Sequence, residues 1–163
     1  LNQLEFGYSN VNMQHFDIVD LIRGVLTKSD ILIKQKEVDL VFEDIDPLYV
    51  WSDAFMAEEV FTNYFTNALN HVAGDKIIRV TAEKLDNTVR VSVFNTGKQI
   101  PEKDINNIWD KFYKVDKART REYGGSGVGL SIVKATMELL GQAYGVENND
   151  DGVTFWYELD CTS

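Results

Sequence analysis

The stretch EVFTNYFTNALNH, residues 59–71, places two stripes of side chains at helical spacing. Residues three or four apart lie on the same side of an α-helix, so each stripe forms one face. The apolar stripe consists of Val60, Phe61, Tyr64, Phe65, Ala68, Leu69 and Val72. The polar stripe consists of Glu59, Asn63, Asn67 and His71, with Asn70 beside them. The stretch therefore predicts a helix that buries one face and presents carboxamides on another.

Apolar patterns on both sides of this helix predict the remaining elements. Ser52 and Asp53 are candidates to cap the helix, which we expect to run to about residue 73. The other predicted helices cover about 16–36, 104–109 and 127–140, and the predicted strands cover 38–42, 48–51, 77–85, 89–93, 142–148 and 153–159. This order predicts an α/β (α+β) two-layer sandwich, with a mixed, mostly antiparallel sheet of about five strands covered on one face by three helices.

The composition limits the classes of partner. The chain has 163 residues, enough for one compact domain, and 26 acidic against 16 basic residues give a net charge of −10. This balance argues against nucleic acid as a partner, because nucleic acid calls for a broad basic surface. No apolar stretch approaches the roughly 18 residues that a membrane-spanning helix needs. Cys161 is the single cysteine, which excludes an internal disulfide and suits a reducing compartment.

The asparagines of the polar stripe are unfavourable in a helix interior. Each costs about 0.5–0.7 kcal/mol relative to alanine, and a bound metal or polar ligand would offset that cost. Amide oxygens are neutral, hard ligands that suit a partly hydrated Mg²⁺ shared with phosphate groups. From the spacing alone, a solvated surface face is an equal alternative.

Two glycine-containing stretches are candidates for ligand contact. Asn95-Thr96-Gly97 ends a strand ahead of Ile100, and glycine there permits close approach of a flat ligand, although an ordinary turn is the simpler interpretation. Residues 124–130, GGSGVGL, lead into a helix, where backbone N–H groups and the helix dipole favour an anion. This run matches neither a dinucleotide-binding fingerprint nor a P-loop. It favours phosphate binding over a flexible hinge.

An aromatic and basic segment precedes the glycine run. Its basic residues are Lys111, Lys114, Lys117, Arg119 and Arg121. A charged interval of about 25 residues between two elements is long enough to form a lid over a site. An exposed loop is the alternative for parts of it.

In this order and spacing, the four features resemble the N, G1, F and G2 boxes of sensor histidine kinases. The chain is similar to the catalytic and ATP-binding domain of that family, within the ATPase superfamily that also includes gyrase and MutL. Residues 112–117 and 125–134 look especially like vancomycin-resistance-type sensor kinases. The resemblance implies the Bergerat ATP-binding fold, with ATP and Mg²⁺ as ligands.

The resemblance also implies roles for individual residues. Glu59 stands where the family has a candidate general base, and Asn67 where it has a ligand of Mg²⁺. Asn95 is expected to face the adenine edge, and Lys114 the terminal phosphate. The full set of implied nucleotide-binding residues is Asn63, Asn67, Asn70, His71, Asn95, Gly97, Ile100, Phe112, Lys114, Gly125, Gly127, Val128, Gly129, Leu130 and Thr154.

Four positions depart from the family pattern. Gln99 replaces a glycine, and Asn70 and His71 replace a basic residue followed by tyrosine. Asn95 stands where the family usually has aspartate. Unlike a carboxylate, an amide can flip and pair with guanine instead of adenine. Base preference therefore depends on whatever fixes the orientation of the Asn95 amide.

By the same resemblance, residues 1–15 are the tail of a preceding dimerisation helix with its linker. Residues 16–160 are the catalytic domain, with an ATP lid at about 102–126. The chain would bind Mg-ATP and donate the γ-phosphoryl group to a histidine on its own dimerisation domain, in a homodimer that serves a response regulator. It would be the cytoplasmic part of a plasma-membrane sensor. Alternatives are a degenerate nucleotide-binding scaffold and an anti-sigma-type Ser/Thr kinase.

Overall fold

The computed structural model describes residues 10–113 and 128–161. The strands are β1 (Gln14–Asp17), β2 (Asp39–Val41), β3 (Tyr49–Ser52), β4 (Ile77–Lys84), β5 (Thr88–Thr96), β6 (Tyr144–Asn149) and β7 (Gly152–Asp160). The helices are α2 (Ile18–Lys28), α3 (Asp30–Gln35), α4 (Ala54–His71), the 3₁₀ turn η1 (Glu102–Asp104) and α6 (Gly129–Leu140).

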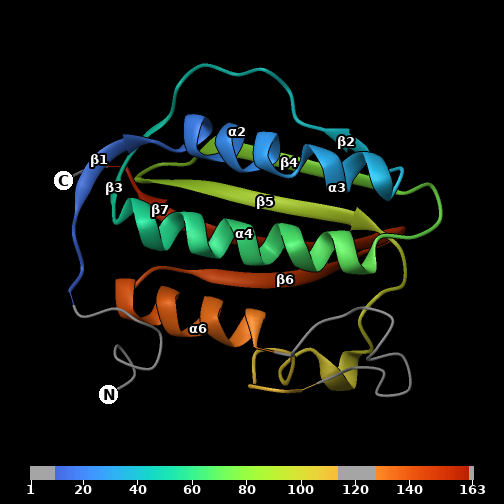
Figure 1. Ribbon diagram of the computed structural model, residues 1–163. Coiled ribbons are helices and arrows are strands. Elements are labelled where there is room, and N and C mark those ends of the chain that lie inside the picture. Colours follow the sequence, from blue (N-terminus) through green and yellow to red (C-terminus); the bar gives the residue numbers. More distant parts are fainter. Residues whose placement is uncertain (1–9, 114–127, 162–163) are drawn as a thin grey trace.

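Five of these strands form one mixed sheet in the order β2-β4-β5-β7-β6. Only the β2–β4 pair is parallel, and the other three pairs are antiparallel. Helices α2, α4 and α6 lie side by side over one face of this sheet, as Figure 1 shows. The short β1 and β3 pair separately as a two-stranded antiparallel sheet. The predicted two-layer sandwich is confirmed.

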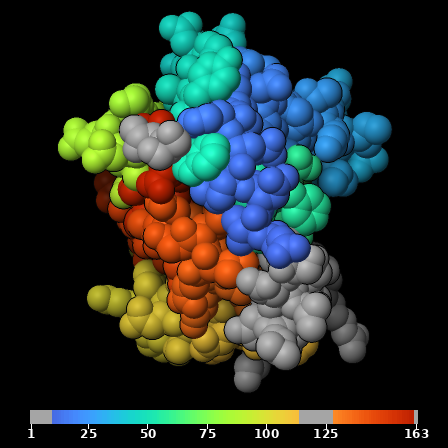
Figure 2. Space-filling view, turned by 90° about the vertical axis from the view of Figure 1, so that its left-hand side faces the viewer, coloured from blue at the N-terminus to red at the C-terminus, as the bar shows by residue number. Residues whose placement is uncertain are grey.

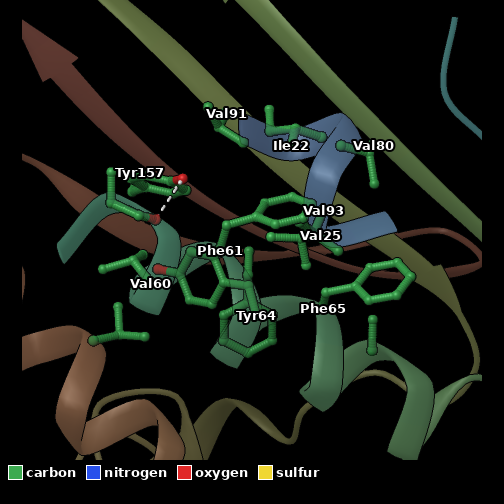
Figure 3. Close-up of a cluster of buried hydrophobic side chains, with 14 of the residues drawn as sticks. Ile22, Val25, Val60, Phe61, Tyr64, Phe65, Val80, Val91, Val93 and Tyr157 are labelled. Carbon is green, nitrogen blue, oxygen red and sulfur yellow. Dashed lines mark hydrogen bonds between the residues drawn. The ribbon is translucent and has the colours of Figure 1, made fainter. Parts of the chain in front are cut away.

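The hydrophobic core fills the space between helix α4 and the sheet. Phe61, Tyr64 and Phe65 project from α4 towards valines of the central strands (Figure 3). Every second residue of β5 and β7 faces this core, because side chains of a strand alternate between the two faces of its sheet. The Tyr64 ring lies against the rings of Phe155 and Tyr157, with centroids 5.2 and 5.8 Å away.

Two predicted helices differ from the structure. The helix expected over 16–36 is two helices preceded by a strand, because residues 14–17 pair with β3 and α2 ends at Lys28. At the break, the Ser29 hydroxyl donates to the carbonyl of Val25, a local bond that competes with continued helix. The helix expected at 104–109 is the single turn η1 followed by non-helical turns.

Within the described residues, no helix is both long and apolar enough to cross a bilayer. Figure 2 shows one side of the molecule, where α6 in orange lies between the N-terminal elements in blue and the segment around residues 101–113 in yellow. The same segment lies below the N-terminal end of α6 in Figure 1. Residues 101–113, which follow the turn after β5, therefore lie on the same side of the fold as the start of α6.

Candidate functional site

The polar stripe of α4 lies beside the packed core rather than on the outer surface. Asp53 caps the helix by accepting a 3.0 Å hydrogen bond from the Met56 N–H. Glu59, Asn63 and Asn67 follow at intervals of four, and all three are only partly exposed. A fully solvated face would leave such residues open to water on all sides. The structure instead holds this stripe in a partly enclosed position, which a ligand site requires.

Asn63 faces the start of helix α6. Its Nδ2 donates a 2.9 Å hydrogen bond to the Glu59 carbonyl, one turn back along α4. A Cβ atom added at Gly129 would lie 3.0 Å from Asn63 Oδ1, so only glycine fits comfortably between the two helices here. Asn63 thus presents its oxygen, an acceptor, towards α6. Its nitrogen would have to leave the Glu59 carbonyl to reach a phosphate oxygen.

The N-terminus of α6 has features that favour an anion. Its N-cap is Val128, which provides no side-chain hydrogen bond, and the first turn contains no acidic residue. The first N–H groups of a helix have no partner within the helix, and they attract anions together with the helix dipole. Leu130 lies in this first turn and is half-buried. The predicted phosphate-binding helix start is therefore brought opposite the amide stripe of α4.

The turn after β5 lies against the C-terminal end of α4. Gly97 has φ +144°, and a Cβ there would come within 2.9 Å of the His71 carbonyl oxygen. Asn95, two residues earlier, is 3% exposed and lies on the helix-covered face, since its partners in register are Ile78 and Val153. The structure therefore brings Asn95 and Gly97 next to the end of the helix that carries the amide stripe.

Asn148 is a residue that sequence reasoning missed. Its amide pairs with both backbone groups of Ile100, accepting from the N–H at 2.9 Å and donating to the carbonyl at 2.8 Å. The side chain of Gln99 also donates to the carbonyl of Asn149, and the N–H of Gly97 donates to the carbonyl of Asp151. The end of β6 and the turn that follows it thus hold the loop that carries Ile100. No sequence pattern singles out Asn148 for this role.

The aromatic segment is anchored at two points. Trp109 packs edge-on against Tyr144 and Phe155, with centroids 5.0 and 5.8 Å away. Tyr113 donates a hydrogen bond to the buried carboxylate of Asp104, and this bond raises the pKa of the Tyr113 phenol. Between these anchors, Phe112 adopts φ +66° and is largely exposed. A left-handed backbone at a non-glycine residue is uncommon and is tolerated where the flanking contacts enforce it.

Thr154 is the described residue that the structure separates from the others. Strand alternation turns it to the face away from the helices, where it pairs in register with Phe94 and donates to Asn149 Oδ1 at 2.6 Å. It lines a shallow hollow of about 410 Å³ on that face, with Arg79, Thr81, Ser92, Phe94, Asn149 and Asp151. Val153 is instead the neighbour of Asn95 on the helix-covered face. The alternation of apolar residues along 153–159 already indicates that Thr154 faces away from the helices.

The remaining predicted residues divide into two groups. Asn70 is half-buried and His71 exposed, both at the end of α4 that approaches Gly97. Lys114, Gly125 and Gly127 lie outside the described residues.

The donor atoms near α4 suit a hard divalent cation. Within the described ranges, no group of three or more His, Cys, Asp or Glu side chains is arranged around one point for a metal. The polar stripe provides the amide oxygen of Asn67, with that of Asn63 one turn before it. Oxygen donors of this kind, few in number, fit Mg²⁺ that keeps several water molecules and is shared with phosphates.

The sequence and the fold of the chain match those of known proteins. Residues 52–163 match the family described as histidine kinase-, DNA gyrase B-, and HSP90-like ATPase. The chain belongs to this ATPase family. Among solved structures, the chain is similar to the catalytic domain of histidine kinase ThkA, which superposes with a TM-score of 0.82 at 31% identity. That match covers 93% of this chain and 97% of the ThkA domain.

Two longer proteins are similar to the chain over part of their length. Sensor protein VanSB of Enterococcus faecalis is 34% identical over 114 residues, which make up 70% of this chain and 26% of VanSB. Histidine kinase ThkA in complex with response regulator protein TrrA matches with a TM-score of 0.82 at 28% identity, covering 99% of this chain and 46% of that one. The chain thus spans about a quarter of VanSB.

Proposed function

We propose that this ATPase domain is the catalytic domain of a sensor histidine kinase, which binds Mg-ATP and donates the γ-phosphoryl group to a histidine on a separate dimerisation domain. The observation that carries the proposal is the placement of Asn63 against Gly129, 3.0 Å from the position of a Cβ there. It sets the amide stripe of α4 opposite the open N-terminus of α6. The names of VanSB, a sensor protein, and ThkA, a histidine kinase, support the same class of activity.

In this proposal, helices α4 and α6 both contribute groups that bind the triphosphate and its magnesium ion. The first N–H groups of α6 donate to phosphate oxygens, and the glycine at 129 lets the backbone come close. Asn67, with Asn63 one turn before it, would hold the magnesium ion through an amide oxygen. When bound, Mg²⁺ neutralises charge on the phosphates. Asn95 meets the base at the opposite end, beside Gly97 and Ile100.

Glu59 is the candidate that handles the proton of the attacking imidazole. Phosphoryl transfer of this kind relies on positioning and electrostatics more than on covalent chemistry by the protein. A neutral imidazole is already nucleophilic near pH 7, so the carboxylate need only orient the ring or accept its proton. Glu59 begins the polar stripe, one helical turn before Asn63, and is partly exposed. An entering histidine ring can therefore reach it.

The partners follow from the same assignment. They are the dimerisation domain that carries the histidine, in a homodimer, and a cognate response regulator. The complex of ThkA with a response regulator supports the second of these. The relation to a sensor protein supports a cytoplasmic position attached to a membrane sensor.

Phosphotransfer in trans tests the proposal. The chain is incubated with radiolabelled ATP, Mg²⁺ and the separately expressed dimerisation domain of a sensor kinase. We expect label on that domain that is lost in acid and retained in base, as for phosphohistidine. Glu59→Gln should slow the transfer while nucleotide affinity stays within about twofold, because Glu59 acts on the histidine rather than on ATP. Nucleotide binding without transfer would favour a scaffold, and acid-stable label would favour a Ser/Thr kinase.

A further inference from the structure

The loop after β5 crosses the end of the sheet and is held on its far side. Asn95 in β5 pairs in register with Val153 in β7, and Val153 pairs with Asn148 in β6. The three residues form one row across neighbouring strands. The backbone of Ile100, a few residues after Asn95, hydrogen-bonds to Asn148 at the other end of this row. Loop 97–100 therefore passes the end of β7 and borders the candidate site.

Asn148 holds the loop at two points with one side chain. Its Oδ1 accepts from the N–H of Ile100 at 2.9 Å, and its Nδ2 donates to the Ile100 carbonyl at 2.8 Å. The amide thus pairs with Ile100 as a residue of a neighbouring strand would, with a donor and an acceptor side by side. A carboxylate, which only accepts, could make one of these bonds but not both.

Two further bonds join the loop to the end of β6 and to the turn after it. The Gly97 N–H donates to the Asp151 carbonyl at 3.1 Å, and the Gln99 side chain donates to the Asn149 carbonyl. Residues 98–101 belong to no helix or strand of their own, so these bonds to distant residues set the course of the loop. A loop that is held before a ligand arrives does not have to be ordered on binding, which favours affinity.

We propose that Asn148 is a positioning residue for the nucleotide, which holds Ile100 in place at the base end of the site before the nucleotide binds. The inference rests on the proposed ATP-binding function, in which Ile100 lies beside the base. Asn148 acts through Ile100 and needs no contact with the ligand. Its loss should therefore weaken ligands that contain a base and spare ligands that consist of phosphates alone.

Titration calorimetry with two ligands separates the two ends of the site, because tripolyphosphate lacks the base and the ribose of ATP. With Mg²⁺ present, Asn148→Ala should weaken ATP binding by roughly 5- to 20-fold, the effect of one or two lost hydrogen bonds, and leave tripolyphosphate binding within about twofold of the wild type. Asn148→Asp has the same shape but sets an oxygen against the Ile100 carbonyl, so it should not restore ATP affinity. Asn87→Ala, in the exposed turn between β4 and β5, is the matched control and should change neither affinity.

Hydrogen exchange followed by NMR measures the contact without any ligand. The Ile100 amide proton is bonded to the Asn148 oxygen, so it should exchange about tenfold faster or more in Asn148→Ala than in the wild type. The amides of β4 and β5 should keep their wild-type rates, which would show that the sheet is intact. In Asn87→Ala, the Ile100 amide should exchange as in the wild type.

The outcomes separate the positioning role from the proposed function. An unchanged exchange rate at Ile100, or ATP affinity of Asn148→Ala equal to that of the wild type, would overturn the role of Asn148 and leave the ATPase assignment standing. Equal weakening of ATP and tripolyphosphate would show a purely structural role for Asn148 and would also overturn the proposal. Failure of the wild type to bind ATP would overturn the proposed function itself.

Discussion

The two faces of helix α4 have different roles, one in packing and the other in ligand binding. One face presents Phe61, Tyr64 and Phe65 to the sheet, and all three are at most 1% exposed. The other face presents Glu59, Asn63 and Asn67, which are partly exposed, and Asn63 lies against Gly129 at the start of α6. The first face contributes packing, and the second contributes hydrogen-bonding groups to a ligand.

The contrast teaches that stability and ligand binding are separable within one helix. The apolar face holds the helix in place by burying surface, a contribution that does not depend on the ligand. The amide face contributes little to stability, because asparagine lowers helix propensity and these side chains bury little apolar area. Substitutions on the amide face should therefore leave the free energy of unfolding nearly unchanged.

The largest expected effect is on stability, from the apolar face. Phe61→Ala should lower the free energy of unfolding by about 3–5 kcal/mol, since it removes a fully buried ring and leaves a cavity beneath the sheet. Urea denaturation followed by circular dichroism measures the loss. Thr62→Ala, at the exposed next position, is the control and should change the free energy by less than about 0.5 kcal/mol. A loss below about 1 kcal/mol for Phe61→Ala would contradict the role assigned to this face.

Gly97→Ala should destabilise the fold at the turn where β5 meets the C-terminal end of α4. Its backbone has φ +144° and its Cβ would press on the His71 carbonyl, so about 1–3 kcal/mol of stability should be lost. Gly74 also has a positive φ, but a Cβ there would contact no neighbour. Gly74→Ala therefore measures the cost of the backbone conformation alone. Thermal unfolding should rank the two variants with Gly97→Ala the less stable. The reverse order would show that contact with α4 is unimportant at this turn.

Tyr64→Phe should lose about 1 kcal/mol at neutral pH, because the Tyr64 hydroxyl donates a 3.0 Å hydrogen bond to the Trp156 carbonyl. Burial raises the pKa of the Tyr64 phenol well above 10 in the folded chain. The folded state then keeps a proton that the unfolded state releases, so stability is full below pH 10 and falls as pH rises above it.

The measurement is the dependence of the free energy of unfolding on pH above pH 10. Above pH 10, Tyr64→Phe should lose stability less steeply than the wild type, by a difference in slope that approaches about 1.4 kcal/mol per pH unit. Identical slopes for wild type and Tyr64→Phe between pH 10 and 11 would show that Tyr64 ionises in the folded state as freely as in the unfolded one.

The smallest expected change in stability is on the amide face. Asn63→Ala gains helix propensity and loses the bond to the Glu59 carbonyl, two effects below about 1 kcal/mol that oppose one another. The urea midpoint should therefore stay close to the wild-type value. Calorimetry with Mg-ATP should nevertheless show weaker binding. A large drop in stability with unchanged affinity would reverse the assignment of the two faces.

Local periodicity predicted the elements whose pattern is strongest. The two stripes of α4 follow from a spacing of four residues, and the five-stranded sheet follows from alternating valines. The position of Thr154 could have been read from the same alternation, which places Val153 beside Asn95. The prediction placed Thr154 with the site because it followed the sequence motif and did not consider which face of the sheet Thr154 occupies.

The remaining features depend on contacts between distant residues. The break at Ser29 arises from a hydroxyl that bonds its own helix rather than solvent, and no change in hydrophobic pattern marks it. Asn148 reaches Ile100 across 48 positions, and Thr96 reaches Ala73 across 23. A local pattern singled out the loop that carries Ile100, whereas the side chain that holds this loop comes from β6.

The dependence of ATP affinity on magnesium tests the central claim most directly. Calorimetric titrations compare the wild type, Asn67→Ala and Thr66→Ala, each with Mg²⁺ and with a chelator. Thr66 is exposed and adjacent on the same helix, which makes it the matched control. We predict that magnesium tightens binding by about tenfold or more in the wild type and in Thr66→Ala, and that Asn67→Ala loses this gain at an unchanged urea midpoint. An Asn67→Ala chain that keeps the full effect of magnesium would contradict the account.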